Sequence, residues 1–235
     1  MTTAGSFTFD LTELNPGTTY HFRAKAVGDG TSYGNEESLV TSTTPPSVVT
    51  NNATGITETT AQFNGYLTSL GTASSANMSF KWGVSPGSYP NETTIRTMST
   101  VGSYSFYLPS LIPGTTYYYR AKAVGDGTGY GTEKSFTTLT VPPSVTTLDV
   151  TEFATSSARL DGHLVSLGSA STVSVSFEWG TNPGSYYNQN TPKTMAFAGA
   201  FSVDVSDLAP GTTYYFRTKS VGHGTSYGAE KSFTT

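Results

Sequence analysis

An internal repeat of 97 residues is the feature that most constrains how this chain can fold. Pro16, Pro113 and Pro210 recur at that interval, and each begins a near-copy of one segment, which reads PGTTYYYRAKAVGDGTGYGTEKSFTT at its second occurrence. The second and third copies are identical at 20 of 26 positions and align without gaps. Solenoid repeats span about 20–50 residues. A period this much longer predicts that each repeat is a whole domain.

Apolar and polar residues alternate along each repeat, which predicts strands rather than helices. In TTYYYRAKAV, residues 115–124, the alternation turns Tyr117 and Tyr119 inward and leaves Arg120 and Lys122 in solvent. Phe63 faces the core from TAQFNGYL in the same way. Seven short strands are separated by turns of Gly, Pro and Ser. This arrangement is typical of a β-sandwich.

The segment from Leu108 to Ala123, LxxLxPGTxYxxRxxA, resembles the fibronectin type III domain. The resemblance implies an all-β fold of tandem, Ig-like seven-stranded β-sandwiches. It also implies a tyrosine corner, in which a tyrosine hydroxyl bonds back to the backbone. The tyrosines at that position are Tyr20, Tyr117 and Tyr214.

The match to this family has one departure. The family usually carries a tryptophan in its second strand, where Phe63 and Leu160 stand here, and Trp82 and Trp179 lie in the third strand instead. Divergent repeats of bacterial and archaeal surface proteins are similar in this respect. We therefore expect both tryptophans to cap the core.

The first copy of the repeated segment arrives too early for a complete repeat. MTTAGSFTFDL at the N-terminus aligns with MSTVGSYSFYL at residues 98–108. Residues 1–42 are therefore predicted to be a partial unit with strands E, F and G only, followed by complete domains at 45–138 and 142–235. Pro-Pro pairs open both complete domains, and such junctions are short and stiff.

Residues 1–42 leave two interpretations open. The partial unit results from a truncation or a misplaced start, with Met1 an internal methionine of a longer array. Alternatively, it docks on another chain by strand addition, which would make the chain a possible homo-oligomer. The candidate inter-chain surface is Phe7, Phe9, Leu11 and Phe22, whose faces should meet the missing strands.

The composition argues against cysteine chemistry, nucleic-acid binding and a membrane span. The chain has no cysteine, which excludes disulfides, thiolate zinc sites and a cysteine nucleophile. Charged residues are 12% and the net charge is −4, so we expect no nucleic-acid partner. No apolar run reaches the roughly 20 residues of a membrane span, and the first residues lack a signal-peptide pattern.

Catalytic residues, metal ligands and cofactors are not expected. His21, His163 and His223 occupy non-equivalent positions, and none belongs to a recognisable catalytic motif. The repeated VGDGT suggests either a calcium loop or a turn. The third copy reads VGHGT, and this exchange favours the turn because a hard cation would not accept histidine.

Tyrosines in loops are the better binding candidates, because exposed tyrosine is a common interface anchor. Six are singled out: Tyr89, Tyr186 and Tyr187 in the WGxxPGSY segments, and Tyr33, Tyr130 and Tyr227 in the last hairpins. The alternative is that they fold back on the end of the sandwich. Asn91, within a sequon in the C–C′ loop, is a candidate glycosylation site.

These observations favour a non-enzymatic structural and adhesive module, extracellular or on the cell surface, whose partners are other protein chains or surface glycans. One alternative is a self-assembling surface filament or layer subunit that uses the partial unit to complete domains between chains. A second is an accessory carbohydrate-binding module.

Overall fold

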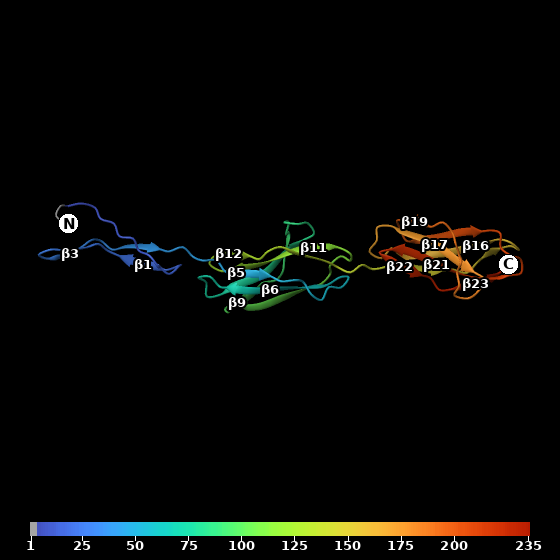
Figure 1. Ribbon diagram of the computed structural model, residues 1–235, viewed down its shortest axis with the longest axis horizontal. Helices are drawn as coiled ribbons and strands as arrows, with labels where there is room; N and C mark the ends of the chain where they lie inside the picture. The colour runs from blue at the N-terminus through green and yellow to red at the C-terminus, as the bar shows by residue number, and fades with distance from the viewer. Residues whose placement is uncertain (1–3) are drawn as a thin grey trace. The chain divides into compact units, whose positions relative to one another are not determined.

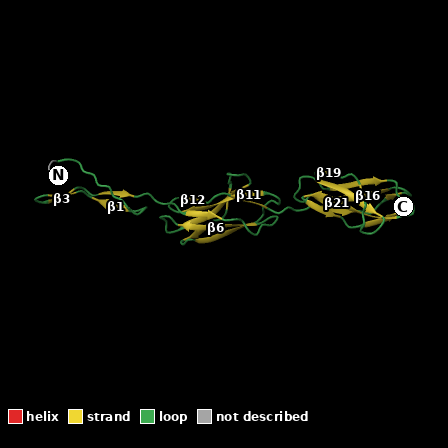
Figure 2. Cartoon of the chain, in the orientation of Figure 1, coloured by secondary structure: helices red, strands yellow, loops and turns green. Residues whose placement is uncertain are grey.

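The computed structural model describes residues 4–235, and within this range every regular element is a strand (Figures 1 and 2). None of the described residues forms a helix that could carry the chain through a membrane. The chain divides into two compact units. One holds residues 4–55 of the described chain with Ala61–Leu108 and Thr116–Phe136; the other holds Ile56–Thr60, Pro109–Thr115 and Thr137–Thr235.

Strand pairing follows the sequence repeat. In the first complete repeat the strands are β5 (Ser47–Thr50), β6 (Ala61–Ser69), β7 (Ala76–Gly83), β8 (Asn91–Glu92), β9 (Arg96–Met98), β10 (Gly102–Leu108), β11 (Thr116–Val124), β12 (Thr128–Tyr130) and β13 (Lys134–Thr137). One sheet has the order β10-β6-β5. The other has the order β12-β11-β7-β8, with β13 on β11 and β9 on β7.

The second complete repeat contains equivalents of these nine strands and one further strand, β15. Its strands are β14 (Ser144–Thr147), β15 (Glu152–Phe153), β16 (Ala158–Ser166), β17 (Val173–Gly180), β18 (Asn188–Gln189), β19 (Lys193–Met195), β20 (Gly199–Val205), β21 (Thr213–Gly222), β22 (Gly224–Tyr227) and β23 (Lys231–Thr234). Strand β16 pairs with β14, β15 and β20, and β17 pairs with β21, β18 and β19. The predicted all-β, fibronectin type III-like sandwich is confirmed.

Alternation along the strands builds each core from aromatic rings. In the first sandwich, Phe63 of β6 stacks on Tyr119 of β11 with ring centroids 4.2 Å apart. Gly65 leaves room for the ring of Tyr104, because a Cβ there would lie 2.6 Å from it. Trp82 is half-buried and meets Tyr117 edge to face at 5.7 Å, at the margin of this core.

Residues 4–42 form less structure than predicted. Their strands are β1 (Thr19–Phe22), β2 (Lys25–Val27), β3 (Thr31–Tyr33) and β4 (Glu37–Val40), and β1 pairs with β4 while β2 pairs with β3. The expected strand E is missing, since residues 4–18 contain no strand. The equivalent strand β10 pairs only with β6, and residues 4–42 contain no segment equivalent to β6.

The break between β1 and β2 has the same cause. In the complete repeat the corresponding strand, β11, runs unbroken for nine residues and pairs with β7 along one edge. No strand lies on that edge of β1 and β2 among the described residues. The backbone between them, at Arg23 and Ala24, is not in a strand.

Candidate interaction site

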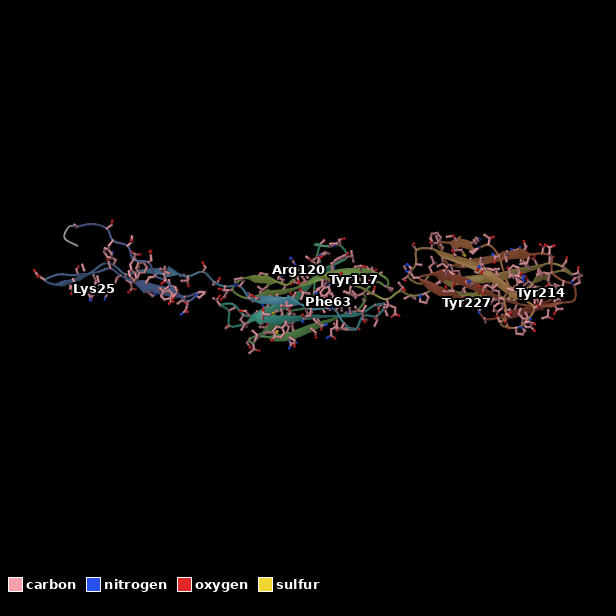
Figure 3. All side chains as sticks on the ribbon, in the orientation of Figure 1. Lys25, Phe63, Tyr117, Arg120, Tyr214 and Tyr227 are labelled. Carbon is pink, nitrogen blue, oxygen red and sulfur yellow. The ribbon has the colours of Figure 1, made fainter. Side chains whose placement is uncertain are left out.

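Four side chains of the first sandwich contact one another in a cluster that we call the tyrosine–arginine clasp. Its members are Tyr89, Arg120, Tyr130 and Glu133. The guanidinium of Arg120, labelled in Figure 3, lies 4.6 Å from the ring centroid of Tyr89 and 4.0 Å from that of Tyr130. The Tyr89 hydroxyl donates to Glu133. The same carboxylate accepts the backbone N–H of Gly87 at 2.8 Å.

These contacts correct the predicted position of Arg120 in solvent. Its side chain is half-buried between two rings, and its Nε atom is buried without a hydrogen-bond partner among residues 4–235. Cation–π contacts explain why the side chain stays there. The clasp ties the loop between β7 and β8 to the segment around β12 and β13, so two loops that could move separately are joined.

The second sandwich repeats the clasp with Tyr186, Arg217, Tyr227 and Glu230. Arg217 lies 4.3 Å from the centroid of Tyr186 and 3.8 Å from that of Tyr227. Glu230 accepts the Tyr186 hydroxyl at 2.5 Å and the backbone N–H of Gly184 at 2.7 Å. Each of these positions lies 97 residues from its counterpart.

The protonation of the clasp is suited to holding it closed. The hydrogen bond from Tyr89 lowers the pKa of Glu133 below its ordinary value. Burial first and the Glu133 contact second raise the pKa of Tyr89. Burial and the contact with Glu230 raise the pKa of Tyr186 to about 12. At neutral pH the tyrosine therefore donates and the glutamate accepts.

A carboxylate beside each clasp forms a salt bridge with a lysine. This lysine lies two residues after the clasp arginine, on the same strand. In the first sandwich, Glu92 of β8 binds Lys122 of β11 at 3.0 Å and Lys81 of β7 at 3.3 Å. Ser79 donates to it at 2.6 Å. Burial alone would raise the pKa of Glu92, but these contacts outweigh burial and lower it to about 2.

In the second sandwich the carboxylate has moved by one strand. Gln189 stands where Glu92 does, and Glu178 of β17 stands where Lys81 does. Glu178 binds Lys219 at 2.9 Å and Arg217 at 3.0 Å, and these contacts lower its pKa against the opposing effect of burial. Both sandwiches thus neutralise the basic strand with one carboxylate, supplied from a different strand in each.

The VGDGT turn has a structural partner. Asp126 accepts a hydrogen bond from Thr72 Oγ1 at 2.7 Å. At the equivalent positions, His223 Nδ1 and Ser169 Oγ are 2.9 Å apart. Aspartate and histidine each hold the neighbouring loop by one hydrogen bond. Residues 4–235 contain no group of three or more His, Asp or Glu side chains that could hold a metal ion.

The hydroxyl groups of two of the three predicted corner tyrosines bond to the backbone. The Tyr20 hydroxyl accepts the backbone N–H of Asn15 at 2.9 Å, and Tyr214 accepts that of Ala209 at 2.9 Å. Tyr117 is buried and its ring stacks on Phe136 with centroids 5.6 Å apart.

The loop tyrosines are not equivalent to one another. Five of the six lie against an arginine of the same repeat, and these are Tyr33, Tyr89, Tyr130, Tyr186 and Tyr227. Tyr187 is different, because its side chain is 62% exposed and does not lie over an arginine. Its hydroxyl accepts the backbone N–H of Thr181 at 3.2 Å and lies 3.0 Å from Thr181 Oγ1. Among the six candidates its side chain is the most exposed.

The sequence predicts Asn91 in a loop, but in the structure this residue lies in a strand. It is the first residue of β8, pairs with Trp82 and is exposed. Its side-chain nitrogen, the atom that would carry a glycan, points toward the carbonyl of Trp82 at 3.4 Å.

Sequence reasoning missed Arg120, Arg217, Glu133 and Glu230 as members of the site. The signal that could have found them is their recurrence at 97 residues together with the loop tyrosines. In residues 4–42 the equivalent cluster is incomplete. Arg23 lies over Tyr33 at 3.9 Å, and Glu36 lies 3.4 Å from His21 Nδ1 instead of binding a second tyrosine.

No described protein family and no curated protein sequence matches this chain. Among solved structures, the sensor domain of the anti-sigma factor RsgI4 of Pseudobacteroides cellulosolvens is similar at 20% identity and a TM-score of 0.33, over 41% of this chain and 96% of that one. The FN1–FN3 domains of chicken CNTN1 are similar at 16% identity and a TM-score of 0.33, over 94% and 76%.

Proposed function

We propose that this chain is a non-enzymatic spacer and adhesive module of an extracellular or cell-surface protein. The observation that carries the proposal is the clasp, which recurs in both complete sandwiches. In each, the arginine, two tyrosines and a glutamate join the loop that follows β7 or β17 to the segment around the last two strands. A sandwich fastened in this way resists local opening, and the Pro45–Pro46 and Pro142–Pro143 junctions restrict the backbone between repeats.

Stretching single molecules of the whole chain between two handles tests this role. Each complete sandwich is expected to unfold in one step that releases about 30 nm of chain, as about 94 residues at roughly 3.5 Å each, less the folded length, require. Arg120→Ala and Arg217→Ala should each lower the force of one step only. Gradual extension without two separate steps would contradict the spacer role.

A binding function at Tyr187 is the second candidate. The ring is 62% exposed, and the equivalent residue of the first sandwich is Pro90, so the chain contains its own comparison. Binding to polysaccharides or to cell-surface proteins should be lost with Tyr187→Ala and kept with Pro90→Ala. Equal binding by both variants would exclude Tyr187 as the contact.

A further inference from the structure

Residues 4–42 present an apolar groove of about 750 Å³, which we call the acceptor groove. Its apolar lining comes from Phe7, Phe9, Leu11, Leu14, Phe22 and Leu39. Phe9 is 83% exposed and Phe7 is 61% exposed. Leaving such rings in water forgoes roughly 1.5–3 kcal/mol each, so the groove is suited to being covered.

The complete sandwiches show which structure covers this surface. Tyr104 and Tyr119 are the equivalents of Phe7 and Phe22, and they are 3% and 0% exposed. Tyr119 is covered by Phe63 of β6. Tyr104 lies against Phe80 of β7 with ring centroids 5.4 Å apart. Both covering residues belong to the half of the repeat that precedes β10.

The incomplete clasp indicates the same partner. Arg23 has one ring where Arg120 and Arg217 each have two. The ring it lacks corresponds to Tyr89 or Tyr186, from the loop that follows β7 or β17. Glu36, the equivalent of Glu133, is not bound to a tyrosine hydroxyl among the described residues.

Charge gives a third, independent indication. Lys25 is the equivalent of Lys122 and Lys219, which bind Glu92 and Glu178. Among residues 4–42, Lys25 makes no salt bridge. The missing carboxylate comes from β8 in one sandwich and from β17 in the other, and both strands again belong to the first half of a repeat.

We infer that the acceptor groove binds a segment equivalent to β5 through β9, the first half of this repeat. The partner supplies an apolar strand for residues 6–11, a second strand for the open edge of β1 and β2, a loop tyrosine for Arg23 and a carboxylate for Lys25. Binding completes a third sandwich. This inference is independent of the spacer role and survives if that role is disproved.

Disulfide trapping tests the predicted register, because the chain has no cysteine of its own. Ser105 pairs with Asn64 in the complete sandwich, and Thr8 is the equivalent of Ser105. The full chain with Thr8→Cys is mixed with a polypeptide of residues 45–97 carrying Asn64→Cys. The matched control polypeptide carries Tyr66→Cys, two residues along the same face.

The Asn64→Cys polypeptide is expected to cross-link at least about tenfold more than the control, because register is strongly specified where one face is buried. Adding Phe9→Asp or Phe22→Asp to the full chain should abolish the difference. Both side chains are exposed in the chain alone, so the complete sandwiches should keep their Trp82 and Trp179 fluorescence. Equal yields from the two polypeptides would overturn the inference.

Hydrogen exchange of the same mixture identifies where the polypeptide binds. New protection at residues 6–11 and at Arg23 and Ala24 supports the acceptor groove. Changes confined to residues 98–138 would mean that the polypeptide had displaced the chain's own strands, and this would overturn the inference. So would a dimer of the full chain alone that Phe9→Asp disrupts, because a second copy would then be the occupant.

Discussion

Residues 4–42 and residues 101–139 have closely related sequences but different structures. The later segment forms β10 as a seven-residue strand and β11 as an unbroken nine-residue strand. The earlier one has no strand before Thr19 and a break at Arg23–Ala24. Its tyrosine corner and hairpin pairings persist, however. Local features therefore survive without the first half of the repeat, whereas strands whose hydrogen-bond partners lie in that half do not form.

The largest expected difference between the two regions concerns Tyr119 and its equivalent Phe22. Tyr119 is fully buried and its hydroxyl donates to the carbonyl of Asn51 at 2.8 Å, whereas Phe22 is 45% exposed. Tyr119→Ala should lower the free energy of unfolding of the first sandwich by about 3–5 kcal/mol. Phe22→Ala should change it by less than about 0.5 kcal/mol.

Urea unfolding followed by Trp82 fluorescence, with Trp179→Phe present throughout, measures this first sandwich alone. Similar losses from both substitutions would show that residues 4–42 are already packed in solution, contrary to the structure.

The clasp supplies the next comparison. Arg120→Ala should lower the free energy of unfolding of the first sandwich by about 2 kcal/mol, because two ring contacts and the packing of the side-chain stem are lost. Arg23→Ala should leave this free energy almost unchanged, because Arg23 and its single ring partner, Tyr33, lie outside the first sandwich. Arg120→Lys should fall between the wild type and Arg120→Ala, because lysine keeps the charge but not the planar group that stacks. The same fluorescence assay applies, and a neutral Arg120→Ala would remove the clasp from the account of stability.

Tyr104 tests a smaller effect at a position where both other copies have phenylalanine, Phe7 and Phe201. Its hydroxyl is buried without a hydrogen-bond partner among residues 4–235, and burial raises the pKa of this tyrosine. Tyr104→Phe should stabilise the first sandwich by about 1 kcal/mol. The converse change, Phe201→Tyr, should destabilise the second sandwich. Trp179 fluorescence reports this change. Destabilisation by Tyr104→Phe would indicate a partner for the hydroxyl.

The smallest expected effect is the pH dependence from Glu92. Its pKa is about 2 in the folded chain, against an ordinary value of 4.5. The stabilisation is therefore complete above the unfolded value and is lost as the pH falls from about 4.5 toward 2. The amount should stay under about 1 kcal/mol, because solvent screens the partly exposed pairs. Glu92→Gln should flatten acid unfolding curves over this range, and an unchanged slope would contradict the assigned ion pairs.

Much of the fold could be predicted from the sequence because its signals are local. Alternation placed Phe63, Tyr117 and Tyr119 in the core, and the 97-residue spacing indicated whole domains. The clasp could not be predicted in this way, because Tyr89 and Glu133 are 44 residues apart and meet only when two loops fold toward each other. Arg120 was misplaced for the same reason. Alternation correctly put it on the outer face, but two rings from other segments cover it there.

The amino-acid sequence by itself determined the repeat, the β class and the facing of most strand residues, because each depends on neighbours in the chain. Only the tertiary structure decided which loop tyrosines are held by arginine, which strand supplies the carboxylate and whether residues 6–11 become a strand. These outcomes depend on hydrogen bonds and ring contacts between segments far apart in sequence. In residues 4–42 the partner segment is missing, so the same local sequence ends in an open groove.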